Sequence, residues 1–207
     1  MKKNKLNKIL SKFKGKKILI VGDIILDKYI FGKVSRISPE APVPICEVNK
    51  QTHSPGGAAY VSTHISNFGG KAYIVGVVGN DADGEIVTSS LQEQNIQIDG
   101  LIKDFERNTV TKTRIIAQHQ QIVRIDYEER MHVSVSIIKE IVNYINKVIK
   151  EVDAVIISDY GKGVVIPSVF NEVIKLGRKF NIPIAVDPKP TYCLSYKGVT
   201  VITPNTF

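Results

Sequence analysis

The sequence predicts an α/β fold built on a doubly wound parallel sheet, with a smaller sheet beside it. Short apolar runs rich in β-branched residues recur along the chain, and amphipathic helical patterns separate them. Strands that alternate with helices are typical of a parallel sheet covered by helices on both faces. Two stretches break this alternation, because each carries strand patterns with no helix between them.

Five apolar runs predict the strands of the parallel sheet. Their consecutive apolar residues are typical of strands that are buried on both faces. In chain order they are "KKILIVGD", "KAYIVGVVG", "DAVIISD", "IPIAVD" and "VTVITP". Apolar residues at helical spacing predict four helices between these runs, at residues 58–68, 86–91, 137–148 and 169–176.

Residues 28–50 and 96–127 predict the small second sheet. The stretch "TVTKTRIIAQHQQIVRIDYEE" alternates apolar and polar residues, which is typical of antiparallel strands with one buried face. The stretch "VSRISPEAPVPICEV" cannot form a helix through its prolines, and Pro42 and Pro44 fit an edge or a bend of a sheet. We expect the two segments to form a lid beside the parallel sheet.

Composition and charge limit the partners of this chain. With 207 residues and 43% hydrophobic content, it is long enough for one domain with a substantial core. The formal net charge is +8, and seven of the 28 basic residues lie in a basic N-terminal leader, residues 1–16. The other basic residues are scattered among acids, so we expect no nucleic-acid partner and a preference for anionic small molecules.

Membrane spans and structural metal sites are not expected. The longest apolar runs are far shorter than the roughly 20 residues that span a bilayer, and no signal peptide pattern begins the chain. We therefore expect a cytoplasmic protein with no membrane partner. The two cysteines, Cys46 and Cys193, lack the spacing of a zinc site, so we expect free thiols.

Polar residues follow the predicted strands at their carboxyl ends, where open α/β sheets bind ligands. They are Asp23, Asp159, Asp187 and Asn205, and Asp27 follows shortly after Asp23. Carboxylates accept hydrogen bonds from sugar hydroxyls. Each residue alone also fits a turn or a helix cap, but together they predict a shared cleft.

Gly56 and Gly57 directly precede a helical pattern in "SPGGAAYVSTHIS". Without Cβ atoms the backbone can approach a ligand closely, and the N–H groups at a helix start favour an anion or a polar oxygen. The pair also fits an ordinary turn. The P-loop pattern and the GxGxxG dinucleotide pattern are both absent.

Six strings of the sequence together resemble the PfkB/ribokinase family of carbohydrate kinases. In order they are "VGDIILDKYIFGKVSRISPEAPVPICEV", "SPGGAAY", "TKTRIIAQHQQIVRIDYEE", "ISDYGKG", "VDPKP" and "ITPN", within Lys17 to Asn205. Within the family they are most similar to the kinase domain of bifunctional heptose kinase/adenylyltransferases. The resemblance implies that residues 17–207 form a ribokinase-like three-layer αβα sandwich with a small β-sheet lid, incomplete at the C-terminus.

The resemblance also implies which residues bind the sugar phosphate. They are Asp23, Asp27, Ser38, Glu40, Gly56, Gly57, Arg114, Arg124 and Asp159. Asp23 and Asp27 would bind hydroxyls, the glycines would let the backbone approach the sugar, and the Ser38 to Glu40 end of the lid would face it. Arg114 or Arg124 would reach the phosphate, although either arginine also fits a solvated surface charge.

The implied reaction transfers a phosphoryl group from ATP to the anomeric hydroxyl of D-glycero-β-D-manno-heptose 7-phosphate. Its product, the 1,7-bisphosphate, leads to ADP-heptose for lipopolysaccharide cores. ATP and Mg²⁺ are the implied cofactors, and Lys162, Lys189 and Asn205 would lie near the phosphate groups. A homodimer joined through the lid is also implied, and no metal ligand is assigned.

Two departures from the family pattern leave other functions open. The Gly-Ala-Gly-Asp element that carries the family's base would lie beyond Phe207, so we expect no catalytic base within these residues. Tyr60 stands where the family usually has an asparagine. The alternatives are a non-catalytic sugar-phosphate-binding or regulatory module, and a kinase of this family for another sugar, which the string "SRISPEAPVP" disfavours.

Overall fold

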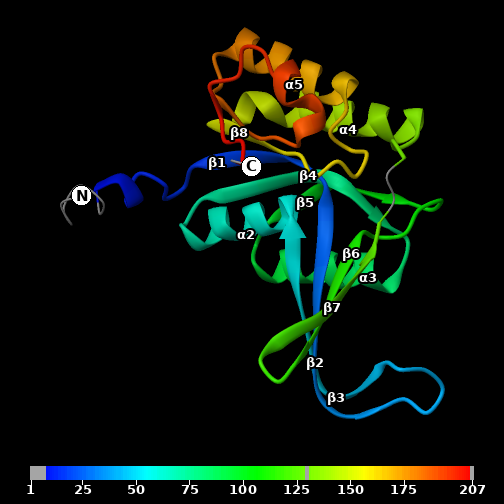
Figure 1. The fold of residues 1–207 in the computed structure, drawn as a ribbon. Helices are drawn as coiled ribbons and strands as arrows, with labels where there is room; N and C mark the ends of the chain where they lie inside the picture. Colours follow the sequence, from blue (N-terminus) through cyan, green and yellow to red (C-terminus); the bar gives the residue numbers. More distant parts are fainter. Residues whose placement is uncertain (1–7, 129–130, 206–207) are drawn as a thin grey trace.

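The computed structural model describes residues 8–128 and 131–205, and its main feature is a parallel sheet (Figure 1). Within these residues the sheet has six strands in the order β10-β9-β8-β1-β4-β5. The strands are β1 (Lys17–Gly22), β4 (Lys71–Gly79), β5 (Gln97–Asp104), β8 (Ala154–Ser158), β9 (Ile184–Asp187) and β10 (Val201–Ile202). All their pairings are parallel, which confirms the predicted α/β fold.

Helices cover both faces of this sheet, so that it is the middle of three layers (Figure 1). They are α2 (Ala58–Asn67), α3 (Ala82–Glu93), α4 (Val135–Val148) and α5 (Pro167–Phe180), with short 3₁₀ segments η1 (Ile149–Glu151) and η2 (Pro190–Ser195). In the central strand β1, Leu19 and Val21 pack toward α4 and α5, whereas Ile20 packs toward α2 and α3. All three side chains are fully buried, which explains the consecutive apolar residues of this strand.

Local sequence signals fix where the helices begin and end. The Asp81 and Ser134 side chains accept hydrogen bonds from the first turns of α3 and α4. Helix α5 begins at Pro167, whose missing N–H costs nothing in a first turn, and it ends at Phe180, directly before Asn181, whose φ of 55° is left-handed. These caps place the helices close to the ranges that apolar spacing predicted.

The second sheet is the lid, and it projects from one edge of the sandwich (Figure 1). Its strands are β2 (Ile24–Ile37), β3 (Pro44–Gly57), β6 (Thr111–Ala117) and β7 (Gln120–Tyr127), in the order β3-β2-β6-β7. The pairs β2–β3 and β6–β7 are antiparallel, but β2 and β6 run parallel. The antiparallel pairing expected for the stretch "TVTKTRIIAQHQQIVRIDYEE" is confirmed by β6 and β7. Strands β2 and β6 are parallel because the chain passes through β4, α3 and β5 before it returns to the lid in the same direction as β2.

The lid boundaries also differ from the predicted ones. Residues 97–104, expected in the lid, form β5 and pair in parallel with β4 of the main sheet. Strand β5 is only partly buried, because it lies at the edge of that sheet. The first lid segment is longer than predicted, because β2 and β3 are continuous with the main body at Ile24 and Gly57.

The proline-rich stretch forms the far end of the β2–β3 hairpin. Ser38 N–H donates to the Val43 carbonyl at 2.9 Å, which closes the turn that contains Pro39 and Pro42. Pro44 is the first residue of β3, an edge strand, where its missing N–H is tolerated. Extended hairpin structure therefore accounts for the prolines.

The basic leader predicted at residues 1–16 is described from Lys8 onward, and residues 1–7 lie outside the described residues. Residues 8–10 are helical and residues 11–15 form turns before β1. No helix in residues 8–128 and 131–205 is long and apolar enough to cross a membrane.

Candidate functional site

A cavity of about 350 Å³ lies where the lid joins the main sheet. We call it the lid cavity. Its lining includes Asp27, Gly56, Gly57, Lys112, Arg114 and Arg124. Because β2, β3, β6 and β7 all contribute to it, the pairing of these strands brings together residues that are far apart in the sequence.

Asp27 and Arg114 form the charged pair at the centre of the lid cavity. The Arg114 guanidinium donates to Asp27 Oδ1 at 2.5 Å, and this hydrogen bond raises the pKa of Arg114. Gly56 faces the other carboxylate oxygen, since a Cβ atom there would lie 2.5 Å from Asp27 Oδ2. The absence of a side chain at Gly56 therefore lets the carboxylate lie against β3.

Gly57 caps the start of α2 at the wall of the lid cavity. Its φ is 56°, and a Cβ atom there would collide with the Asp23 carbonyl oxygen. That carbonyl accepts the Ala58 N–H at 2.9 Å, and no described side chain caps α2. A glycine pair without Cβ atoms therefore lets a polar ligand approach this helix start closely.

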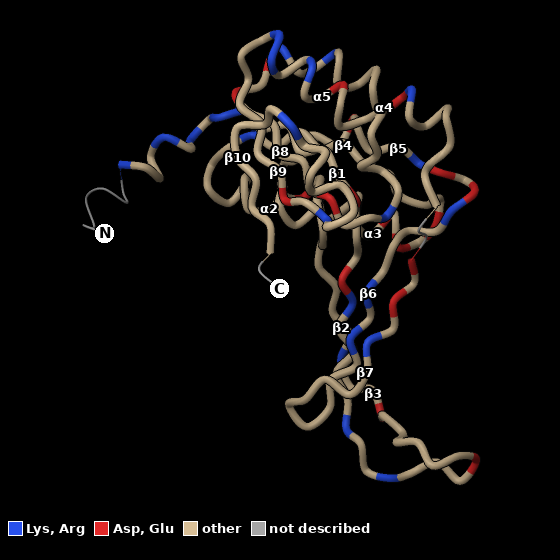
Figure 2. Tube along the Cα trace, turned by 45° about the horizontal axis from the view of Figure 1, so that its top comes forward, with Lys and Arg blue, Asp and Glu red and all other residues tan. Residues whose placement is uncertain are grey.

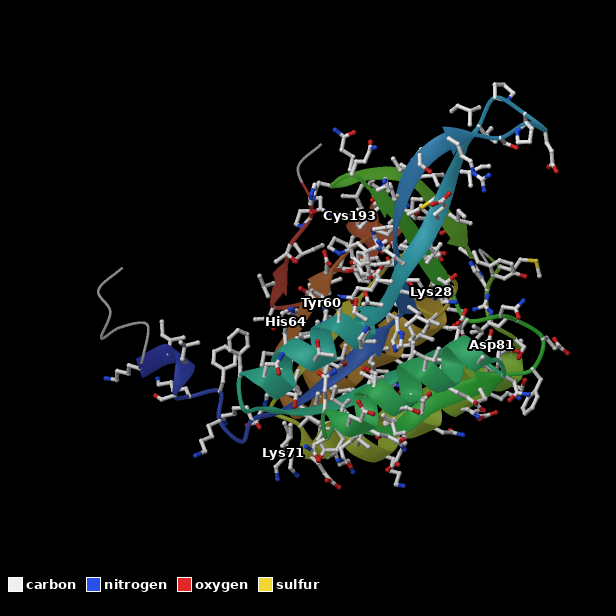
Figure 3. The ribbon with its side chains drawn as sticks, turned by 90° about the horizontal axis from the view of Figure 1, so that it is seen from below. Lys28, Tyr60, His64, Lys71, Asp81 and Cys193 are labelled. Atoms are coloured by element: carbon white, nitrogen blue, oxygen red, sulfur yellow. The ribbon has the colours of Figure 1, made fainter. Side chains whose placement is uncertain are left out.

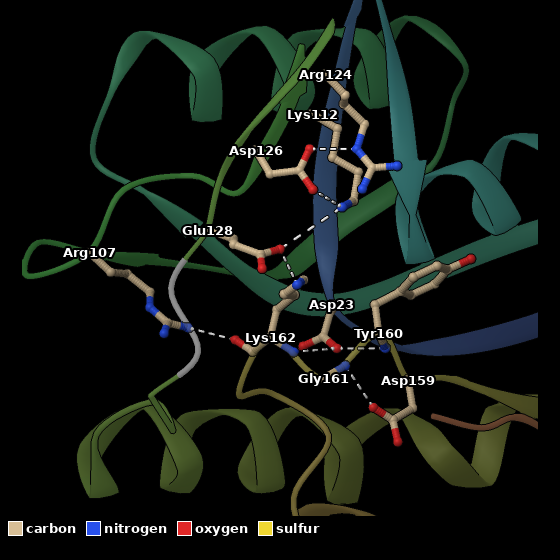
Figure 4. Close-up of polar contacts among 10 residues, drawn as sticks. All are labelled: Asp23, Arg107, Lys112, Arg124, Asp126, Glu128, Asp159, Tyr160, Gly161 and Lys162. Atoms are coloured by element: carbon tan, nitrogen blue, oxygen red, sulfur yellow. Dashed lines mark hydrogen bonds and ion pairs between the residues drawn. The ribbon is translucent and has the colours of Figure 1, made fainter. Parts of the chain in front are cut away.

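Asp23 lies beneath the site and holds a loop in place (Figure 4). It is 1% exposed, and its carboxylate accepts backbone N–H groups of Tyr160 at 2.8 Å, Lys162 at 3.1 Å and Val164 at 3.1 Å. Burial raises the pKa of Asp23, although the three backbone donors oppose this shift. The sequence predicted that Asp23 binds sugar hydroxyls. In the structure both of its carboxylate oxygens accept backbone N–H groups, so Asp23 is not among the groups open to a sugar.

A second cavity, of about 400 Å³, lies beyond Tyr160 along the carboxyl edge of the sheet. We call it the sheet-edge cavity. Asp159, Asp187, Lys189 and Asn205 line it, and Tyr160 lines both cavities. The structure thus brings together Asp159, which was predicted to bind substrate, with Lys189 and Asn205, which were predicted to lie near phosphate groups. This cavity lies next to the lid cavity, because Tyr160 lines both.

Asp159 organises the sheet-edge cavity from below. Its carboxylate accepts the Gly161 N–H at 2.9 Å and the Tyr196 hydroxyl at 2.7 Å. It also accepts the Lys189 N–H at 3.3 Å, which fixes the backbone before η2. Burial and the nearby Asp159 carboxylate raise the pKa of Asp187. The cavity therefore combines carboxylates with the ammonium group of Lys189.

Lys162 lies at one end of a row of alternating charges that joins the main body to the lid (Figure 4). Its ammonium group contacts the Glu128 carboxylate. Lys112 lies 3.9 Å from Glu128 and 3.0 Å from Asp126, and Arg124 donates to Asp126 at 2.8 Å. Burial opposes ionisation of Asp126, but the hydrogen bonds from Lys112 and Arg124 outweigh it and lower its pKa.

Sequence reasoning missed Lys112, Asp126 and Glu128. A usable signal was present, because Lys112 and Arg114 share one face of β6, and Arg124, Asp126 and Glu128 recur at every second position from β7. Basic and acidic residues on one face of adjacent strands predict cross-strand ion pairs.

Ser38 and Glu40 do not reach either cavity within the described chain. The Glu40 N–H donates to Ser38 Oγ at 3.1 Å, at the far end of the hairpin (Figure 1). Strands β2 and β3 remain paired as far as Ile37 and Pro44, which carries this turn away from the main body. The structure therefore does not bring these two predicted residues to the site.

Tyr60 lines the lid cavity from the first turn of α2. Its ring meets the His64 ring edge-on, with the centroids 4.3 Å apart, and the two side chains neighbour one another in Figure 3. The Tyr60 side chain is 53% exposed. It offers an aromatic surface and a hydroxyl to a ligand in this cavity.

Comparison with solved structures supports the architecture. The chain superposes on a carbohydrate kinase from Agrobacterium tumefaciens with a TM-score of 0.67 and 15% identity, over 90% of this chain and 60% of that one. It also superposes on Arabidopsis thaliana ribokinase complexed with ribose and ATP, with a TM-score of 0.64 and 14% identity, over 93% and 60%. At these identities the likeness shows the fold alone, and it confirms the ribokinase-like prediction.

Comparison with related sequences identifies the family of this chain. The bifunctional protein HldE of Helicobacter pylori strain G27 is 43% identical over 192 residues, which are 93% of this chain and 42% of the relative. HldE of Geobacter sulfurreducens is 40% identical over 187 residues, 90% of this chain and 38% of the relative. The chain thus spans about two fifths of the curated relatives it matches. The model of the pfkB family of carbohydrate kinases matches residues 16–207, so the chain belongs to this family of phosphotransferases.

Proposed function

We propose that this chain supplies the sugar-binding half and the lid of an ATP-dependent kinase for D-glycero-β-D-manno-heptose 7-phosphate. The observation that carries the proposal is the lid cavity, where the Asp27 carboxylate lies beside Lys112, Arg114 and Arg124. A carboxylate suits sugar hydroxyls, and clustered cations suit a phosphate group. The HldE relatives and the string "SRISPEAPVP" favour heptose phosphate over other sugars.

In this proposal the lid cavity orients the sugar. Asp27 accepts hydrogen bonds from sugar hydroxyls, while Gly56 and Gly57 let the sugar approach the start of α2. Arg114 holds Asp27 in position through their 2.5 Å hydrogen bond. Arg124 and Lys112, which share Asp126, bind the phosphate at the other end of the substrate.

The sheet-edge cavity would receive the phosphate groups of ATP. Lys189 supplies positive charge and Asn205 supplies an amide, and both line the same cavity as Tyr160. Closure of the lid would exclude water, so that the phosphoryl group passes to the sugar and not to solvent. The proposal assigns no catalytic base to the residues of this chain.

Mg²⁺ would neutralise phosphate charge in such a reaction. Among residues 8–128 and 131–205, no group of three or more His, Cys, Asp or Glu side chains is placed to hold a metal ion. The described residues therefore do not form a complete site for it, and no step is derived through the ion.

We also propose that two chains associate through the lid. The outer part of the β2–β3 hairpin projects into solvent, and its apolar residues Ile37, Val43 and Val48 are exposed. A two-stranded hairpin is only marginally stable alone in water, so contact with a second lid would stabilise it. Sedimentation velocity should show a dimer that Val43→Lys and Val48→Lys together convert to a monomer, and a wild-type monomer would refute this part of the proposal.

Calorimetric titration tests the proposed substrate. The chain is titrated with heptose 7-phosphate, with ribose and fructose 6-phosphate as controls, and then with Mg-ATP. Selective binding of heptose 7-phosphate is the expected result. Binding of fructose 6-phosphate or ribose in its place would assign the chain to another sugar, and no sugar binding at all would refute the role of the lid cavity. Selective sugar binding without nucleotide binding would limit the chain to a sugar-phosphate-binding module.

A further inference from the structure

The segment before β1 has features that the proposed function does not use. Residues 8–16 lie outside the layered core and lead away from it, with lysines along their length and no acidic residue among them (Figure 2). Ile9, Leu10 and Phe13 recur at the spacing of one helical face, although the helix itself covers only residues 8–10 of this segment and Phe13 lies in the turns that follow. These three side chains are 42%, 39% and 37% exposed. We call residues 8–14 the basic apolar segment.

The lysines of this segment differ in what they contact. Lys16 pairs with Asp153 at 2.6 Å, and Lys17 lies 3.7 Å from Glu151, so these two are partly neutralised by the main body. Lys8, Lys12 and Lys14 are exposed and form no ion pair with any described residue. Three ammonium groups are thus left facing solvent beside exposed apolar side chains.

The segment is held against the domain at one place. The Phe13 ring packs on Phe68 at the end of α2, with the centroids 5.7 Å apart, and Gly15 N–H donates to the Gly69 carbonyl at 2.8 Å. Phe68 is itself 51% exposed, and Lys71 follows shortly after it in the sequence, at the start of β4. The apolar and basic side chains therefore form one surface at a fixed position on the molecule.

The sequence continues this pattern toward the N-terminus. Leu6 extends the apolar spacing of positions 9, 10 and 13, and further lysines occur at positions 2, 3 and 5. Apolar residues on one helical face with lysines around them are typical of segments that lie on membrane surfaces.

We propose that the basic apolar segment binds the surface of a membrane that contains anionic phospholipids. Ile9, Leu10 and Phe13 enter the boundary between headgroups and acyl chains, and the lysines contact the anionic headgroups. Binding of this kind needs no spanning segment, so it agrees with the absence of one among the described helices. It reverses the expectation of no membrane partner, which considered spanning segments and signal peptides only. A lipid surface fits better than a nucleic acid, because a phosphate backbone would leave these three apolar side chains in water.

Vesicle co-sedimentation of the 207-residue chain tests the proposal. Mixed phosphatidylcholine and phosphatidylglycerol vesicles are compared with pure phosphatidylcholine vesicles. The chain should sediment with the anionic vesicles only, and a high salt concentration should release it because the lysine charges are then screened. No binding to anionic vesicles, or equal binding to both kinds, overturns the proposal.

Two triple variants show whether vesicle binding depends on the lysines of this segment or on the net charge of the whole chain. Lys8→Gln, Lys12→Gln and Lys14→Gln together should weaken vesicle binding by about a hundredfold, since each lysine near an anionic surface contributes about fivefold. The control replaces three exposed lysines elsewhere, at positions 33, 103 and 139, and loses the same charge. It should bind within about threefold of wild type, because these lysines lie outside the proposed surface. Equal weakening in both triple variants would show a response to overall charge and overturn the proposal.

The apolar contribution needs its own variant. Ile9→Gln with Leu10→Gln keeps every lysine and should still reduce vesicle binding by about tenfold. The thermal unfolding midpoint should stay at the wild-type value, since both side chains are exposed. A duplex DNA is the final ligand. DNA binding without vesicle binding would assign the segment to nucleic acid and overturn the membrane proposal.

Discussion

Replacing Asp23 by alanine should destabilise the fold strongly, because this buried carboxylate holds the loop of residues 160–164. Three backbone N–H groups lose their acceptor in the variant. A buried donor left unpaired costs about 1–3 kcal/mol. The Val164 bond is buried and its donor stays unpaired, whereas the Tyr160 and Lys162 bonds are partly buried, so water can recover part of their cost. We expect a loss of about 3 kcal/mol in the free energy of unfolding.

Urea unfolding followed by circular dichroism measures this loss. Asp99→Ala is the matched control, because Asp99 is an exposed aspartate on β5; a surface substitution of this kind changes stability by less than about 0.5 kcal/mol. If Asp23→Ala lost less than about 1 kcal/mol, the three backbone hydrogen bonds would not be what holds the loop, and the reasoning would be refuted.

Three more predictions follow from the site and the caps. Asp27→Asn should weaken binding of the sugar phosphate by at least about tenfold in calorimetry, because it removes a charged acceptor; an unchanged affinity would contradict the role of Asp27. Gly57→Ala should cost at least about 2 kcal/mol in urea unfolding, because its φ of 56° and the Asp23 carbonyl leave no room for a Cβ atom; an unchanged midpoint would contradict this. Burial opposes ionisation of Asp81, but hydrogen bonds from Thr109 and Gly84 lower its pKa below 3.8, so its contribution to stability is present above pH 3.8 and is lost as the pH falls through the lowered value. The stability difference between wild type and Asp81→Asn should therefore shrink in acid, and a difference that stays constant would contradict this.

The main sheet could be predicted from the sequence because its strands carry a strong signal. Each central strand is buried on both faces, so runs such as "ILIVG" contain consecutive apolar residues that few other environments produce. The edge strand β5 was misassigned for the opposite reason, because "QIDGLIKD" is only partly buried. Its membership of the main sheet depends on pairing with β4, which local pattern does not encode.

The lid cavity was predicted in part. Asp27, Gly56, Gly57, Arg114 and Arg124 were all expected to contact substrate, and the structure places them around one cavity. Whether a substrate uses them stays a prediction. Their convergence follows from the register of β2 with β3 and β6, which pairs Asp27 with Ser54 and Lys112.

The roles of Asp23, Ser38 and Glu40 could not be read from local sequence. An aspartate at a strand end looks the same whether it faces a ligand or a loop, and only the path of residues 160–164 shows that three N–H groups converge on Asp23. The distance of Ser38 and Glu40 from the site depends on how far β2 and β3 remain paired, and that length is a property of the folded hairpin.

The measurement that tests the central claim most directly compares heptose 7-phosphate with the same sugar lacking its phosphate. Calorimetry gives both affinities for wild type, Asp27→Asn and Arg124→Gln. If the lid cavity binds the sugar at Asp27 and the phosphate at Arg124, Arg124→Gln should reduce the preference for the phosphorylated sugar by about tenfold or more. Asp27→Asn should weaken both ligands equally and leave that preference unchanged. An unaltered preference in Arg124→Gln would contradict the proposed orientation of the substrate.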